Sequence, residues 1–220
     1  MESVLVSWSS GKDSCMALYE ILASRKYHVA ALLSTLTRED DAVGIHFLRR
    51  SLLERQAESL RLPLCKVYLS RGAGNQEYEA KLTEALASYR DKGVSGMVFG
   101  DLFLEDVRNF REALLPRTGL SGIYPLWKRD TAELIRRFIA LGFKAIITSV
   151  DARVLDRSFA GQILDADLLA GLPPYVDPCG ENGEFHTFVF DGPLFERAIK
   201  FTTGETAMKD GHYFCDLLPA

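Results

Sequence analysis

The sequence predicts an α/β protein with a doubly wound, mostly parallel sheet, followed by a smaller α+β part. Three observations predict this fold. Short apolar runs without polar alternation recur along the first two-thirds of the chain, and helix-like segments separate them. After about residue 150 the pattern changes to Gly- and Pro-rich chain that ends in a hairpin signal. We therefore expect two domains, residues 1–150 and residues 151–220.

The strands of the first part are expected where short apolar runs occur. In chain order they cover residues 3–8, 28–36, 64–69, 95–99, 122–125 and 143–150. Because neighbouring parallel strands need crossover connections, a helix must join each pair, and the crossovers should be right-handed.

The helices of the first part are expected where apolar residues recur at helical spacing. They cover residues 15–26, 46–62, 76–92, 104–115 and 131–141. Leu18, Ile21 and Leu22 form one such stripe. Pro63 breaks the second helix, and Gly93 stops the third.

The second part carries weaker signals. A short helix is expected over 160–170 and a strand over 186–190, with a Gly- and Pro-rich segment between them. The segments 196–207 and 212–217 flank Asp210-Gly211, a dipeptide that favours a two-residue hairpin turn.

Ligands of parallel α/β sheets bind beyond the carboxyl ends of the strands. Four segments directly follow predicted strands and should therefore meet at one rim: 9–14, 34–37, 100–101 and 124–127. The smaller part is expected to pack against this rim.

Composition narrows the class of protein. The chain has 220 residues, 47% hydrophobic and 25% charged, which excludes a disordered protein. A net charge of −4 argues against a nucleic-acid partner, and no apolar run reaches the roughly 18 residues of a membrane helix. The four cysteines, Cys15, Cys65, Cys179 and Cys215, form no C-x-x-C pair, so reduced thiols are expected. We expect a cytoplasmic protein.

The segment 9–14 carries the strongest chemical signal, because it lies between the first strand and the first helix. A glycine permits a tight turn, backbone N–H groups converge at the helix N-terminus, and a lysine and hydroxyls add phosphate ligands. Its residues are Ser9, Ser10, Gly11, Lys12, Asp13 and Ser14. The alternative is an ordinary helix N-cap with the lysine in solvent.

This segment resembles the S-G-G-x-D-S loop of the PP-loop ATP pyrophosphatases, also called N-type, which have an adenine-nucleotide-hydrolase-like fold. With the segments 100–101, 124–127 and 180–187, and with Asp191-Gly192-Pro193, the chain is similar to the diphthine–ammonia ligase family over about residues 3–200. Two positions depart from the family pattern. Ser10 replaces a glycine and is expected to have an ordinary φ, and His186 replaces an acid.

The resemblance implies an ATP-dependent ligase that releases AMP and pyrophosphate. A substrate carboxylate would attack the α-phosphate, and ammonia would convert the resulting acyl-adenylate into an amide. Lys12 and Mg²⁺ would offset the charge that grows on the pyrophosphate, and the catalytic residues of this half of the site would be Lys12 and Asp101. Asp13 and Asp101 are the expected ligands of Mg²⁺.

The resemblance also implies a nucleotide site beyond the loop. Ser34 and Thr35 stand where the superfamily holds adenine, although a plain strand-end turn explains them equally well. His46 is either a site residue or an ordinary residue at the start of its helix. Gly100 is also expected to bind the nucleotide. The alternative is that Gly100-Asp101 merely caps the N-terminus of the following helix. Gln56 with Ala57 is expected to pack.

The acceptor pocket is expected around the Gly-rich segment. Its residues would be Trp127, Glu181, Gly183, Glu184 and Thr187, with Glu184 and His186 as catalytic groups. Glu184 and His186 should point the same way if a strand begins there. A core position for Trp127 and a solvated acidic loop are the alternatives.

Two acceptors are compatible with the sequence. One is diphthine on elongation factor 2, and the other is a small-molecule carboxylate, for example one of cobalamin salvage. Ammonium is the expected nitrogen source, and a homodimer stays open. Two other functions use the same loop: thiolation or lysidine formation on tRNA, and a non-catalytic nucleotide sensor.

Overall fold

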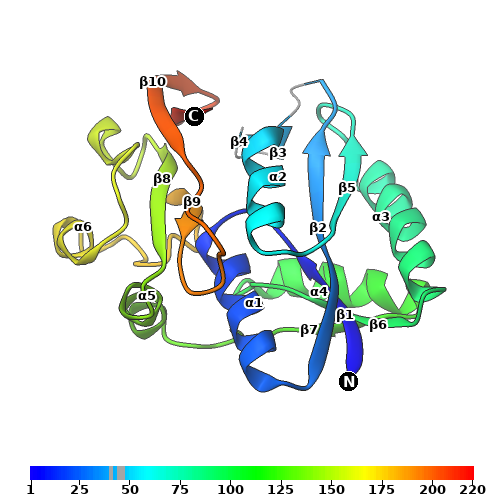
Figure 1. Ribbon diagram of the computed structural model, residues 1–220. Coiled ribbons are helices and arrows are strands. Elements are labelled where there is room, and N and C mark those ends of the chain that lie inside the picture. Colours follow the sequence, from blue (N-terminus) through cyan, green and yellow to red (C-terminus); the bar gives the residue numbers. More distant parts are fainter. Residues whose placement is uncertain (40–41, 44–47) are drawn as a thin grey trace.

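Figure 1 shows the computed structural model, which describes residues 1–39, 42–43 and 48–220. Five strands form a parallel sheet in the order β5-β2-β1-β6-β7. They are β1 (Glu2–Ser7), β2 (Tyr27–Thr37), β5 (Leu64–Leu69), β6 (Val94–Val98) and β7 (Ser121–Ile123). Two short antiparallel strands, β3 (Ala42–Val43) and β4 (Leu48–Arg49), extend the end of β2. The predicted parallel α/β sheet is confirmed.

Helices cover both faces of this sheet, as its apolar strands require. They are α1 (Lys12–Ser24), α2 (Arg50–Ser59), α3 (Asn75–Arg90), α4 (Glu105–Leu114) with the 3-10 turn η2 (Leu115–Thr118), and α5 (Thr131–Ala140). Alternate residues of β1 enter different cores, since Val4 and Val6 pack with α1 and Leu5 packs with α3. Among the described residues, no helix is long and apolar enough to cross a membrane.

The second sheet is antiparallel, in the order β10-β11-β8-β9. Its strands are β8 (Lys144–Asp151), β9 (Phe185–Asp191), β10 (Phe201–Lys209) and β11 (His212–Pro219). The prediction of a parallel strand over 143–150 is therefore wrong, because β8 pairs antiparallel with both β9 and β11. An apolar run predicts a buried strand without saying which sheet it joins.

Other boundaries moved by a few residues. The helix expected over 160–170 is wrong in its first half, since α6 covers Ala166–Gly171 and a 3-10 turn, η3, covers Arg157–Phe159. The helix expected over 46–62 is observed only as α2, and residues 46–47 lie outside the described residues. The hairpin at Asp210-Gly211 is confirmed, with φ of 50° and 80° at its two turn residues.

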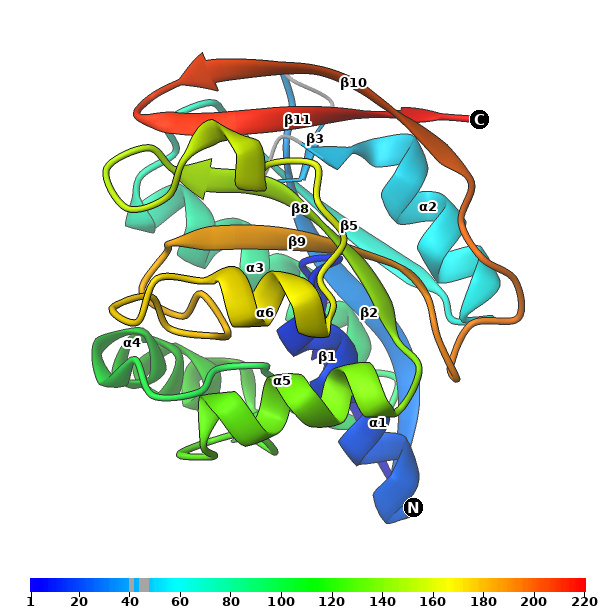
Figure 2. The same cartoon turned by 90° about the vertical axis from the view of Figure 1, so that its left-hand side faces the viewer.

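Helices α1 and α2 lie between the two sheets (Figure 1), and a single apolar core joins them. Figure 2, turned by 90°, shows β9 alongside α1. The N–H of Val189 on β9 donates to the carbonyl of Ser10 at 3.0 Å, and the N–H of Lys12 donates to Thr187 Oγ1 at 3.1 Å. The second sheet is thus bonded directly to the segment 9–14.

Gln56 on α2 joins the two sheets through its side chain, which is fully buried. Its Oε1 accepts from the Trp8 indole at 3.0 Å. Its Nε2 donates to the carbonyls of Ser10 at 3.1 Å and Val189 at 2.6 Å. The expectation that Gln56 merely packs is incomplete, because every polar atom of its side chain has a partner.

Replacing Gln56 with Met should lower the free energy of unfolding by at least about 2 kcal/mol, since each buried polar group left unpartnered costs roughly 1–3 kcal/mol. Gln56→Glu should be destabilising at pH 8, because its carboxylate would face two carbonyl oxygens, and less so at pH 5, where the acid can be protonated and donate. Urea unfolding followed by circular dichroism measures both.

Gln76→Met is the matched control, because Gln76 is exposed on α3. A midpoint for Gln56→Met that shifted no more than that of the control would contradict the bridging role.

Candidate active site

The segment 9–14 forms a turn between β1 and α1, and Gly11 is the N-cap of the helix. Gly11 has no side chain to cap the first turn, so backbone N–H groups there can face an anion. Ser10 has a φ of 71°, so the expectation of an ordinary φ is wrong. This left-handed backbone costs of order 1 kcal/mol for a non-glycine residue, and the two hydrogen bonds to the Ser10 carbonyl hold it in place.

Lys12 lies at the first position of α1 with only 4% of its surface exposed. Its Nζ donates to Asp13 Oδ2 at 2.8 Å and lies 5.6 Å from the centre of the Phe185 ring. Burial alone lowers the pKa of the Lys12 ammonium, but Asp13, together with Cys179 and Glu181, more than offsets this, and the pKa is raised. Lys12 is therefore a permanent cation in a largely enclosed position.

Gly100 and Asp101 follow β6, the neighbour of β1 in the sheet. A Cβ at Gly100 would lie 2.7 Å from the Asp13 carbonyl carbon, so only glycine permits this close approach. Asp101 accepts a hydrogen bond from Arg111. Burial, reinforced by Asp13, raises the pKa of the Asp101 carboxyl. The two aspartates therefore face one site.

Glu181 reaches the same site from the Gly-rich segment before β9. Its Oε1 accepts the N–H of Leu102 at 3.0 Å. Burial and the nearby Asp13 raise the pKa of Glu181 to about 7. Because a proton-transfer group works best with a pKa near the working pH, Glu181 is suited to accept or donate a proton near neutrality.

Glu184, by contrast, organises its own loop. Its carboxylate accepts the N–H of Asp177 at 3.1 Å, the N–H of Asn182 at 2.9 Å and the Asn182 side-chain amide at 2.9 Å. Burial alone raises its pKa, but these hydrogen bonds outweigh burial, and the pKa is lowered. The strand begins at Phe185, so Glu184 turns inward while His186 faces a cavity.

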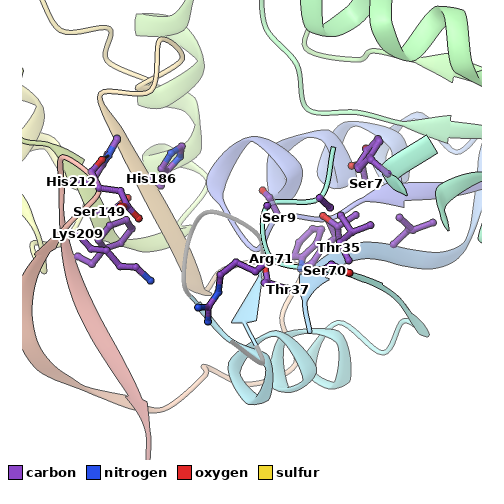
Figure 3. A pocket seen from close by; sticks show the side chains of 18 of the residues that line it. Ser7, Ser9, Thr35, Thr37, Ser70, Arg71, Ser149, His186, Lys209 and His212 are labelled. Atoms are coloured by element: carbon purple, nitrogen blue, oxygen red, sulfur yellow. Dashed lines mark hydrogen bonds between the residues drawn. The ribbon is translucent and has the colours of Figure 1, made fainter. Parts of the chain in front are cut away.

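Two adjoining cavities of about 820 Å³ each meet at the segment 9–14. The first opens beside β2 and the hairpin tip, and Figure 3 shows Thr35, Thr37 and Ser70 facing His186 and His212 across it. The second contains the charged groups described above. Residues common to both are Ser7, Ser9, Arg111, His186 and His212.

The predicted site residues are distributed unevenly over these cavities. The second cavity brings together Ser9, Gly11, Lys12, Asp13, Ser14, Gly100, Asp101, Glu181, Gly183, His186 and Thr187. Thr35 lines the first cavity, whereas the buried Ser34 hydroxyl donates to the Trp8 carbonyl at 2.6 Å. His46 lies outside the described residues.

Trp127 is placed away from the cavities. Within the described part of the chain, it lines neither of them. Arg108 covers both the Trp127 ring, at 4.6 Å, and the Tyr124 ring, at 4.5 Å. This contact favours a packing role for Trp127.

Several lining residues have no local sequence signal. Arg111 points from α4 toward Asp101, and Ser149 and His212 come from the second sheet. Of these three, Arg111 and Ser149 carry no signal at all, whereas the place of His212 directly after the Asp210-Gly211 turn could have drawn attention to it. No group of three or more His, Cys, Asp or Glu suited to a metal occurs among the described residues.

The geometry defines a class of protein. The strand order places the switch point between β1 and β6, and a glycine-bearing loop at a helix N-terminus occupies it. Doubly wound sheets bind nucleotides at this position. The chain therefore has the features of an α/β nucleotide-binding protein with an added antiparallel sheet.

Comparison with known proteins specifies the family. The diphthamide synthase N-terminal domain matches residues 2–122, and the diphthamide synthase C-terminal domain matches residues 130–218. The chain belongs to the diphthamide synthase family.

Its curated relatives are named diphthine–ammonia ligase. The Schizosaccharomyces pombe protein is 27% identical over 95% of this chain, which spans 38% of that relative's length. The Mus musculus and Homo sapiens proteins are each 28% identical over 94% of this chain, which spans 85% of their lengths.

The raised pKa of Glu181 predicts a pH dependence of stability. A carboxyl that titrates near 7 when folded and near 4.5 when unfolded binds more protons in the folded state between these values. Its contribution to stability is therefore present below about pH 4.5 and is lost as the pH rises through 7. Glu181→Gln should flatten the fall in melting temperature between pH 5 and pH 8, measured by circular dichroism.

Glu133→Gln is a suitable control, since Glu133 lies in the first turn of α5 away from both cavities. A slope unchanged in Glu181→Gln relative to the wild type would argue against burial of an ionisable carboxylate at this position.

Proposed function

We propose that this chain is an ATP-dependent ligase that converts a substrate carboxylate into an amide, with ammonia as the nitrogen donor. The observation that carries the proposal is the buried Lys12 of the segment 9–14, which lies at the switch point of the sheet and lines the second cavity. The name of its relatives, diphthine–ammonia ligase, supports the same chemistry.

The two cavities suit the two ends of ATP. The polyphosphate would lie in the second cavity, against Lys12 and the N–H groups that open α1. The nucleoside would lie in the first, where Leu33, Thr35 and Met97 offer apolar and hydroxyl contacts. The α-phosphate would then stand where the cavities meet.

The reaction balances in two steps. A carboxylate oxygen of the acceptor attacks the α-phosphorus, the bond from that phosphorus to the bridging oxygen breaks, and pyrophosphate leaves with the electron pair. Ammonia then attacks the acyl carbon, the carbon–nitrogen bond forms, AMP leaves and one proton is released. Lys12 offsets the charge that grows on pyrophosphate, and its burial strengthens this effect. Glu181 would take up the proton.

The charged groups of the second cavity suit a divalent cation. Burial and mutual repulsion raise the pKa of both Asp101 and Glu181 beside Asp13, which is a cost that a cation would relieve. Asp13 and Asp101 would hold Mg²⁺, which usually takes one or two carboxylates and fills its other positions with phosphate oxygens and water. Bound there, it would neutralise charge on the phosphates.

We propose diphthine on elongation factor 2 as the acceptor, by analogy with the relatives' name. Thiolation of tRNA is disfavoured because burial raises the pKa of all four thiols, to about 12 at Cys179, which opposes formation of a nucleophilic thiolate. A small-molecule carboxylate is the alternative acceptor, motivated by His186 in place of the family's acid.

Lys12→Ala should reduce pyrophosphate release at least about 100-fold, the usual effect of removing one group that stabilises transition-state charge. The assay supplies ATP, Mg²⁺, ammonium and elongation factor 2 that carries diphthine, and circular dichroism checks folding. Lys26→Ala, an exposed lysine after α1, is the control and should keep full activity.

Wild-type activity retained by Lys12→Ala would refute the assignment of the loop. AMP formation by the wild type with a small carboxylate, and none with the diphthine-bearing factor, would favour the alternative acceptor.

A further inference from the structure

The second sheet turns one continuous row of side chains toward the first cavity. Ser149 on β8 pairs with His186 on β9 and with Phe214 on β11. Directly paired residues share one face of a sheet, and His212, two positions before Phe214, shares it as well. We name these four residues the histidine wall, and all of them line the first cavity.

Ser149 is the unexplained member of this wall. Its side chain is fully buried, yet its hydroxyl has no hydrogen-bond partner among the described residues. A buried hydroxyl without a partner is costly, so such groups in folded proteins usually await water or a ligand. Because Ser149 lines the first cavity, a ligand there can supply the missing partner.

The wall also reaches the place where the reaction would occur. His186 and His212 line both cavities, and the α-phosphate of the proposed ATP lies at their junction. The opposite side of the first cavity belongs to the parallel sheet, where Thr35 and Leu33 are proposed to contact the nucleoside. Figure 3 shows Ser149, His186 and His212 on the other side of the gap from Thr35. The proposed nucleoside occupies the side of the junction formed by the parallel sheet. A second substrate would therefore contact the histidine wall.

The chemistry of the wall selects the group that it would hold. A hydroxyl and two imidazoles offer O–H and N–H donors to a carboxylate. His212 Nδ1 donates to the Asp210 carbonyl at 3.3 Å, so the protonated imidazole has its Nε2–H left for the ligand. We propose that the histidine wall binds the carboxylate of the acceptor and directs it at the α-phosphate, with Ser149 and His212 as its donors. This inference rests on the proposed function, because it assigns the acceptor half of the same site.

The test compares Ser149→Ala and His212→Ala with the wild type, using ATP, ammonium and diphthine-bearing elongation factor 2 as probes. Loss of one good hydrogen bond should raise KM for the modified factor about 10-fold and leave KM for ATP within about twofold. His212→Gln, which keeps an N–H donor, should recover part of the loss. His28→Ala is the control, since the exposed His28 lines neither cavity.

Direct binding of the same factor, measured in the presence of a non-hydrolysable ATP analogue, separates this inference from the proposed function. The wild type could bind the factor without forming AMP while the wall variants lose binding. That result would support the histidine wall as the acceptor site and contradict the proposed reaction. If the wild type is active and the variants raise only KM for ATP, or change neither KM, the wall assignment is overturned. If the wild type does not bind the factor, the wall assignment and diphthine as the acceptor are both overturned.

Discussion

The carbonyl of Ser10 is the point on which the site depends. It accepts the N–H of Val189 from the second sheet and the Nε2 of Gln56 from α2. A trans peptide is planar, with its C=O and N–H on opposite sides, so fixing this carbonyl turns the N–H of Gly11 the other way, where it donates to Ser9 Oγ at 3.4 Å beside the second cavity. The same two hydrogen bonds therefore hold the left-handed φ of Ser10. They also orient the segment 9–14 and attach the second sheet to it.

Much of the parallel sheet could be predicted from the sequence, because its signals are local. Apolar runs, helical stripes and the stop at Gly93 each act within one element, and the strand-loop-helix unit around Gly11 contains its own signal. The sheet that β8 joins could not be predicted in this way. Its apolar residues fit a buried strand of either sheet, and its partners Phe185 and Phe214 lie far along the chain.

The candidate site shows the same limit. Glu181 and Glu184 lie three positions apart among glycines, and composition cannot say which enters the cavity. The loop decides it: Gly180 and Gly183 have positive φ, and Asn182 turns its amide onto Glu184, which leaves Glu181 to face Asp13. Gln56 was missed for a related reason, since a polar residue on a helix acquires a structural role only when distant carbonyls converge on it.

The division of the site between two sheets has a dynamic consequence. A nucleotide seated across both cavities would touch β1 and β2 on one side and β9 on the other. Any fluctuation that separates the two sheets would disrupt the site. Nucleotide binding and the contact between the sheets are therefore thermodynamically linked. The bound nucleotide would then stabilise the contact between the two sheets. It would slow their local separation and protect the segments that join them from proteases.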